Sequence, residues 1–185
     1  MVVNYKYKLP PFNHQAEALD TGWDRIEFGL FMEMGTGKSK VLIDNMGMLY
    51  LSGLIDFALV IAPKGVYRNW VAKEIPEHMS DDVPHRVIRW VTAPNKKQLA
   101  EMRSVKDKFD GLTIFVMNVE AFSSPKGNAS GQWMARALGS NGLIAIDEST
   151  TIKNHKAKRT KNLMKIAANF KYKRLLTGSP ITKSP

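Results

Sequence analysis

A run of five residues in the first quarter of the chain could bind a phosphate group. It consists of Gly35, Thr36, Gly37, Lys38 and Ser39. Glycines let backbone N–H groups turn inward on an anion, a lysine neutralises phosphate charge, and a serine hydroxyl at the start of a helix can bind Mg²⁺. The run follows an apolar stretch and precedes an amphipathic one, which favours a phosphate-binding loop over a glycine-rich turn with a solvated lysine. Met32 stands where the general pattern GxxxxGK, followed by Ser or Thr, has its first glycine.

A pair of acidic residues, Asp147 and Glu148, follows the apolar run 143–146. Two carboxylates at the end of a buried strand suit the hydrolysis of a nucleoside triphosphate. One can hold Mg²⁺, and the other can orient and deprotonate the attacking water. The alternative is that the pair caps the helix that follows. A phosphate-binding loop in the same chain favours the catalytic interpretation.

These residues need a framework that brings them together, and the apolar pattern indicates one. The predicted strands are residues 26–32, 57–62, 86–91, 112–117, 143–146 and 172–176, and the predicted helices are residues 38–51, 66–78, 95–108, 132–138 and 155–168. Strands that alternate with helices predict an α/β fold, with a mainly parallel central sheet and helices on both faces. The glycine- and serine-rich stretch 123–131 is interpreted as a mobile surface loop.

Ligands of such sheets bind at the carboxyl ends of the strands, and several unusual residues follow predicted strands. Besides the phosphate-binding loop and the acidic pair, they are Lys64, Asn118, Thr177, Gly178 and Ser179. We therefore expect one site at this edge of the sheet.

The composition excludes several classes of protein. The chain has no cysteine and four scattered histidines, which excludes disulfides and thiolate zinc sites and leaves Mg²⁺ with oxygen ligands as the metal to expect. No apolar run is long enough to cross a bilayer, and the N-terminus does not resemble a signal peptide. At 185 residues with 44% hydrophobic content, the chain fits one domain. We expect a cytoplasmic protein with no membrane partner.

The net charge of +10 is concentrated in the last fifth of the chain. All 17 acidic residues and 17 of the 27 Lys and Arg lie at or before Glu148, and the other ten basic residues lie between Lys153 and Lys183. This asymmetry suggests contact with nucleic acid or another polyanion. The alternative is a solvated helix face.

Six segments, taken in order, resemble the motifs of the superfamily two helicases and translocases, most closely their Swi/Snf-like branch. They are residues 11–15 with Gln15 (the Q motif), MEMGTGKS (motif I), ALVIAPKGVYRNW (motif Ia), FVMNVEAF (motif Ib), AIDEST followed by IKNHKAKRTK (motif II) and RLLTGSPI (motif III). That family does not require the first glycine of the general loop, which accounts for Met32. The resemblance implies that residues 1–185 form a single P-loop domain, the first RecA-like ATP-binding domain of such a motor.

The resemblance also implies roles for the nucleotide-site residues. Gln15 would contact adenine and favour ATP over GTP; the alternative is a polar residue near a helix start. Gly35, Thr36, Gly37 and Lys38 would hold the β and γ phosphates, Ser39 and Asp147 would hold Mg²⁺, and Glu148 would be the catalytic base beside Lys38 and Asp147. Trp70, in the family's Asn-Trp pair after motif Ia, is interpreted as a core residue.

Two further groups of residues follow from the same resemblance. Thr177, Gly178 and Ser179 would couple the nucleotide state to nucleic acid, although a simple strand exit would also explain them. Lys64, Asn118, Lys153 and Asn154 would contact nucleic acid, mainly through its phosphates.

The chain departs from the family pattern in two places. Motif II continues with Ser149 and Thr150, where most relatives have Ala or Gly and then His or Gln. The sequence also ends at Pro185, directly after motif III. The second RecA-like domain, which supplies the arginine finger and half of the nucleic-acid track, is absent from it. We therefore expect a piece of a longer protein that hydrolyses ATP slowly by itself.

These observations predict the motor domain of an ATP-dependent DNA helicase or translocase. Its partners would be ATP, Mg²⁺, duplex or single-stranded DNA, and a second RecA-like domain of the same longer chain. The form of motif Ib suggests a bacterial or phage-infected cell, and we expect a monomer. One alternative is a non-catalytic basic nucleic-acid-binding module that retains the fold. Another is a P-loop ATPase that acts on a protein. Gln15 and the LLTGSP segment argue against this second alternative.

Overall fold

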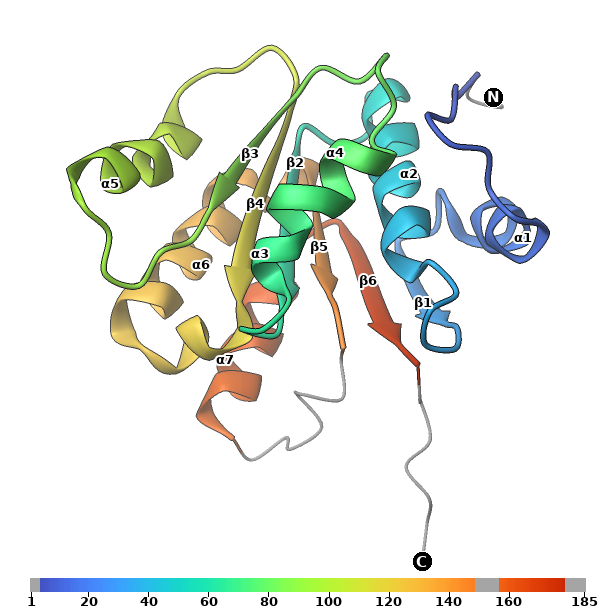
Figure 1. Ribbon diagram of the computed structural model, residues 1–185. Helices are drawn as coiled ribbons and strands as arrows, with labels where there is room; N and C mark the ends of the chain where they lie inside the picture. The colour runs from blue at the N-terminus through green and yellow to red at the C-terminus, as the bar shows by residue number, and fades with distance from the viewer. Residues whose placement is uncertain (1–3, 149–156, 179–185) are drawn as a thin grey trace, which may run out of the picture.

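A six-stranded parallel sheet forms the centre of the computed structural model, which describes residues 4–148 and 157–178 (Figure 1). Its strands are β1 (Glu27–Phe31), β2 (Phe57–Ala62), β3 (His85–Arg89), β4 (Leu112–Asn118), β5 (Gly142–Ile146) and β6 (Tyr172–Thr177), in the order β1-β6-β5-β2-β4-β3. Every pairing is parallel. The predicted parallel sheet and all six predicted strands are confirmed.

Helices cover both faces of the sheet, as predicted (Figure 1). The first face carries α1 (Asn13–Gly22), α2 (Lys38–Leu51), α3 (Tyr67–Asn69), a π-helical turn (Trp70–Glu74) and α4 (Ile75–His78). The second carries α5 (Lys96–Arg103), α6 (Pro125–Leu138), α7 (Lys158–Ala167) and 3-10 turns at Ser104–Lys106, Val119–Ser123 and Gly139–Asn141. In the described residues, no helix combines the length and apolarity that a membrane span requires.

The central strand β2 shows why two cores form. All six of its residues are buried, and successive side chains point to opposite faces. Ala58, Val60 and Ala62 therefore pack under α2 and α4, while Phe57, Leu59 and Ile61 pack under the helices of the second face. This two-sided burial is what the uninterrupted apolar run 57–62 requires.

The predicted helix 66–78 is interrupted by the π-helical turn Trp70–Glu74. Pro76 lies at the start of α4 and has no N–H group to donate, so the regular hydrogen-bond ladder cannot run through it. The helical path continues, but its register changes at Trp70. Trp70 is the first residue of this turn and is buried.

The prediction of a mobile loop over residues 123–131 is wrong. The 3-10 turn Val119–Ser123 passes into α6, which begins at Pro125 with the Ser124 hydroxyl accepting a hydrogen bond from the Gly127 amide at 3.1 Å. A Cβ atom on Gly127 would lie 2.2 Å from the Ala121 carbonyl oxygen. Gly127 thus permits close packing instead of flexibility.

Arg174 shows that the basic C-terminal excess is not all surface charge. Only 1% of this β6 residue is exposed, and its guanidinium donates to the Asn45 side chain at 2.8 Å and to the Gly22 and Trp23 carbonyls at 3.3 and 3.2 Å. Burial lowers the pKa of Arg174 to about 10. Arg174 joins β6, α2 and the end of α1, and it is therefore not available to a polyanion.

Candidate nucleotide-binding site

The phosphate-binding loop runs from the end of β1 to the start of α2. Gly35 and Gly37 both have φ of 80°, a left-handed conformation that glycine adopts without steric cost. Gly37 is the N-cap of α2, and Lys38 is the first residue of that helix. Helix N-terminal amides point along the axis toward the loop, and the helix dipole favours an anion there.

The Lys38 side chain is held inside the loop. Its amine donates to the carbonyl oxygens of Met32 at 3.0 Å and Glu33 at 2.9 Å, and only 9% of the residue is exposed. The Thr36 hydroxyl also donates to the Glu33 carbonyl, at 2.7 Å. Met32 packs against the first core, so this position serves the core as well as the loop.

The structure places Gln15 against the same loop. Its side-chain amide donates to the Thr36 carbonyl at 2.9 Å, and its side-chain oxygen accepts from the Phe12 amide at 3.0 Å. The exposed His14 ring also lies 3.0 Å from the Thr36 carbonyl oxygen. Gln15 is 2% exposed, so α1 and the phosphate-binding loop are packed as one unit.

Asp147 lies directly beyond β5, where its amide extends the sheet by donating to the Ile61 carbonyl at 2.7 Å. Its carboxylate accepts a hydrogen bond from the indole N–H of Trp70 at 2.9 Å. Burial raises the pKa of Asp147, and the neighbouring Glu148 adds to that rise, while the Trp70 bond and the charge of Lys38 oppose it.

Trp70 is the site residue whose role the sequence did not reveal. The ring is buried in the first core, as predicted, but its N–H holds the Asp147 carboxylate. The sequence did carry one signal of this role, because a buried tryptophan usually needs an acceptor for its N–H. Its position at a π-helical turn, a feature frequent at functional sites, is a second signal that only the structure supplies.

Glu148 follows with φ of 50°, the only positive φ of a non-glycine residue among those described. A side chain in this left-handed region costs of order 1 kcal/mol or more, and such residues cluster at functional sites. Glu148 is half-buried, at the same edge as the phosphate-binding loop.

Motif III lies against the phosphate-binding loop of motif I. Thr177 pairs with Phe31 at the end of β1 and is buried. A Cβ atom added to Gly178 would lie 3.0 Å from the Met34 side chain and 3.7 Å from the Lys38 amine. The end of β6 is thus packed against the loop, as a coupling element would need to be.

The predicted nucleic-acid residues lie in different environments. Lys64 is exposed after β2, whereas Asn118 is 5% exposed and donates to the Glu120 carboxylate at 3.0 Å. Lys153, Asn154 and the coupling residue Ser179 lie outside the described residues. Their predicted roles stay predictions.

The oxygen donors at this edge suit Mg²⁺. Ser39 is the second residue of α2, and Asp147 offers a carboxylate whose orientation Trp70 maintains. A hydroxyl and a carboxylate are the hard ligands that Mg²⁺ uses beside water and phosphate oxygens. Within residues 4–148 and 157–178, no group of three His, Cys, Asp or Glu side chains could hold a metal by itself.

The parallel sheet and the loop that caps α2 define a RecA-like P-loop domain. The chain belongs to the family of the SNF2-related domain, whose family model matches residues 24–185. The predicted resemblance is therefore confirmed, and family and fold together support a motor domain of the helicase or translocase type.

Two solved structures show the same fold. The SWI2/SNF2 ATPase core of Sulfolobus solfataricus in complex with dsDNA matches with a TM-score of 0.69 and 19% identity, over 97% of this chain and 34% of that chain. The UvsW helicase of bacteriophage T4 matches with a TM-score of 0.61 and 16% identity, over 92% of this chain and 53% of that chain. A comparison with curated proteins gave no match.

Proposed function

We propose that this chain is the first motor domain of an ATP-dependent DNA translocase or helicase and forms part of a longer protein. The observation that carries the proposal is the position of three sequence motifs at one edge of the sheet. The Lys38 amine lies inside the loop of motif I and faces Gly178 of motif III, and Asp147 of motif II directly follows β5. This is the arrangement that binds a nucleoside triphosphate and senses its state.

In this proposal the residues divide the work by chemistry. When ATP binds, the Lys38 amine exchanges the carbonyls of Met32 and Glu33 for phosphate oxygens, which are charged and therefore stronger acceptors. Ser39 and Asp147 hold Mg²⁺, which neutralises phosphate charge when bound. Glu148 accepts the proton of the attacking water. Gln15 favours adenine over guanine.

The proposal that DNA is the partner rests on the family to which the chain belongs and on its surface charge. Lys64 and three lysines of α7, Lys158, Lys161 and Lys165, are exposed and could reach phosphates. The first solved structure above was determined with dsDNA, and we extend that partner class to this chain. The arginine finger would come from a second RecA-like domain. A motor domain that acts without this arginine is expected to hydrolyse ATP about a thousandfold more slowly, or slower still.

The first test is the affinity for MgATP, measured by calorimetry in the wild type and in Lys38→Ala. We expect binding to weaken about a hundredfold or more, because two charge-assisted hydrogen bonds to phosphate are lost. Lys165→Ala removes the same charge from an exposed site on α7 and should leave the affinity unchanged. Equal affinities for Lys38→Ala and the wild type would exclude this nucleotide site.

The second test separates a motor from a basic binding module. In a protein that continues past Pro185 with its natural sequence, DNA should stimulate ATP hydrolysis. DNA binding that depends neither on nucleotide nor on Glu148, with hydrolysis unchanged by DNA, would favour the non-catalytic module. Repeating the DNA titration at two salt concentrations measures how much of the binding is to phosphates.

A further inference from the structure

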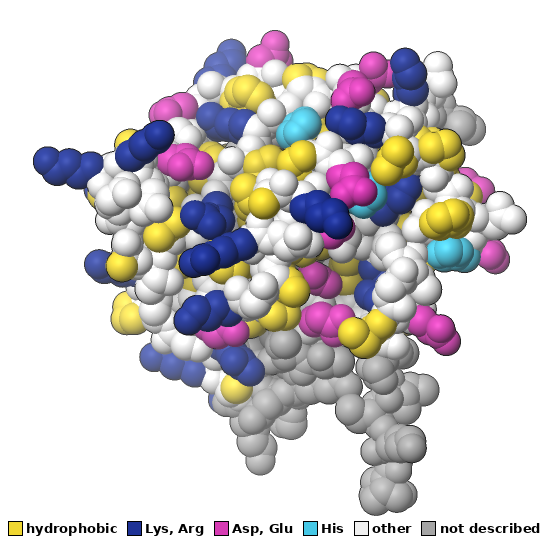
Figure 2. Space-filling model, viewed as in Figure 1, with side chains coloured by type: hydrophobic (Ala, Val, Ile, Leu, Met, Phe, Trp, Pro, Cys, Tyr) yellow, Lys and Arg dark blue, Asp and Glu magenta, His cyan; other side chains and the backbone are white. Residues whose placement is uncertain are grey.

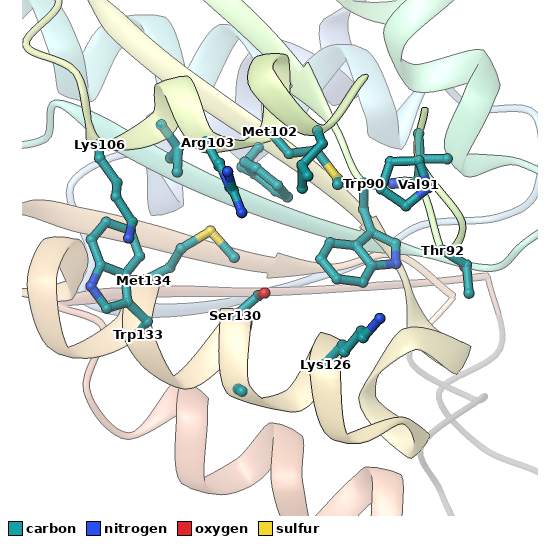
Figure 3. Close-up of a pocket in the computed structure, with 15 residues that line it drawn as sticks. Trp90, Val91, Thr92, Met102, Arg103, Lys106, Lys126, Ser130, Trp133 and Met134 are labelled. Carbon is teal, nitrogen blue, oxygen red and sulfur yellow. Dashed lines mark hydrogen bonds between the residues drawn. The ribbon is translucent and has the colours of Figure 1, made fainter. Parts of the chain in front are cut away.

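A second hollow lies on the opposite face of the sheet from α2. It is a cavity of about 680 Å³ between α5 and α6, with the ends of β3 and β4 beneath it (Figure 3). Figure 3 shows Trp90, Met102 and Met134 lining it, and Phe115 and Val105 complete an apolar floor. None of the residues assigned to the nucleotide site lines this cavity.

Trp90 contributes its aromatic ring to the wall of the cavity. The residue is 7% exposed, and its indole N–H is buried with no acceptor in the part of the chain that the structure describes. The Trp90 backbone amide donates to the Val116 carbonyl at 2.9 Å and so extends the sheet, which fixes the main chain of this residue beside the cavity. The cavity therefore has an aromatic wall whose polar atom is not exposed to a ligand.

The rim of the cavity is positively charged. Arg103 of α5, Lys106 of the following 3-10 turn and Lys126 of α6 are exposed, and none of them has an ion pair within residues 4–148 and 157–178. The Lys106 amine lies 5.0 Å from the centre of the Trp133 ring. No acidic side chain lines the cavity, and Figure 2 shows Lys and Arg side chains gathered on the side of the molecule that carries α5.

We propose that this cavity binds a small organic anion with a flat apolar body. The apolar body would lie on Met102, Met134 and Phe115, and the negative charge would lie among the rim cations. The volume is that of small-molecule sites, which combine an apolar lining with few polar groups. A nucleic-acid strand needs a basic track that continues past one site, whereas these cations surround a single hollow.

The probe for this site is 8-anilinonaphthalene-1-sulfonate, with N-phenyl-1-naphthylamine as the neutral compound of the same ring system. Both are titrated into the full chain without nucleotide, and fluorescence is followed. We expect one site for the sulfonate and at least tenfold weaker binding of the neutral compound.

Matched variants locate the bound dye. Ser130→Trp fills the cavity and should weaken sulfonate binding at least tenfold, whereas Ala137→Trp, on an exposed part of the same helix, should not. Lys126→Gln should weaken it several-fold, and Lys171→Gln, at an exposed position just before β6, should have no effect. MgATP affinity is measured in each variant, so a failure here is distinct from a failure of the proposed nucleotide site.

Three results with the two dyes would overturn the proposal. They are the absence of sulfonate binding to the folded chain, equal binding of the neutral compound, and sulfonate binding that Ser130→Trp and Lys126→Gln both leave unchanged. Displacement of the dye by a short DNA duplex or an acidic peptide, at an affinity sensitive to Lys126→Gln, would reassign the cavity to a macromolecule and equally overturn it.

Discussion

The nucleotide site and the cavity between α5 and α6 each contain a buried tryptophan and basic side chains, but they satisfy these groups differently. At the nucleotide site Trp70 donates to Asp147, and Lys38 donates to two carbonyls of its own loop. At the cavity the Trp90 N–H has no acceptor among the described residues, and the rim cations have no acidic partners there.

The difference indicates two ways of preparing a binding site. Internal partners keep the groups of the nucleotide site in position, and a ligand has to compete with them, so binding is an exchange of hydrogen bonds. At the cavity the rim cations have no acidic partners among the described residues, so a ligand there would displace water and no protein partner. The first arrangement suits the proposed triphosphate ligand, and the second suits the proposed small organic anion.

The largest effect is expected from Glu148→Gln in a protein that extends past Pro185. Without a base to accept the proton of the attacking water, turnover should fall about a hundredfold or more. MgATP affinity should change less than about twofold, because the amide keeps the shape of the side chain. Phosphate release and calorimetry measure the two quantities. Undiminished turnover would remove Glu148 from the mechanism.

The next effect tests how tightly the loop is packed against α1. Gly37→Ala places a Cβ atom 2.3 Å from the Gln15 side-chain nitrogen and forces alanine to φ of 80°. We expect a loss of about 2 kcal/mol in the free energy of unfolding, measured with urea. Gly35→Ala is the control, since it has the same φ with no atom within 4 Å and should cost about 1 kcal/mol. Equal losses would mean that Gln15 does not constrain the loop.

Two identical substitutions compare the sites directly. Trp70→Phe removes the donor that Asp147 uses, whereas Trp90→Phe removes a donor that no described residue accepts. Both lose similar ring volume. We therefore expect Trp70→Phe to lower the free energy of unfolding by about 1.5 kcal/mol more than Trp90→Phe does. If the two losses are equal, the distinction between the sites has no energetic basis.

The same Trp70→Phe variant should change the titration of Asp147. The indole bond favours the ionised carboxylate, so its loss raises the pKa of Asp147 further above the ordinary value. Because a raised pKa means that the folded state binds its proton more readily, the carboxylate should ionise at higher pH than in the wild type. NMR titration of the Asp147 carboxyl carbon measures the shift, and an unchanged or lowered pKa would contradict the assignment.

The smallest effect is expected from Gln15→Ala. The preference for ATP over GTP should fall about tenfold, or about 1.4 kcal/mol, if the carboxamide contacts adenine. His14→Ala is the control, because its exposed ring also lies near the Thr36 carbonyl and should leave the preference unchanged. Competition binding of ATP and GTP measures this preference. An unchanged preference would restrict Gln15 to supporting the loop.

Much of the fold could be predicted because its signals are local or continuous along the chain. The buried strands have uninterrupted apolar runs, and helix α2 has the predicted bounds of residues 38–51. The errors occurred where a residue type has two uses. Gly127 and Gly131 looked like loop residues, but they serve packing against Ala121 and Phe122. Arg174 was counted in the basic excess of the last fifth of the chain, but it is a buried donor.

The candidate site, like the fold, could be predicted from the sequence only in part. The order of the motifs placed Lys38, Asp147, Gly178 and their neighbours at one edge of a parallel sheet, since consecutive strands of such a sheet end on the same side. The partnership of Trp70 with Asp147 could not be read from the sequence, because 77 positions separate the two residues. Thr150, Lys153, Asn154 and Ser179 lie outside the described residues, so their roles stay predictions.

The sequence by itself determined which chemistry this chain could carry and the class of fold that carries it. Glycines, a lysine and two carboxylates at strand ends are chemical requirements, and they are visible as residue types at fixed spacing. Only the tertiary structure decided which buried polar groups have partners, and so separated Trp70 from Trp90. The reason is physical: a hydrogen bond depends on the positions of two atoms to within a fraction of an ångström, and packing across the sheet sets those positions.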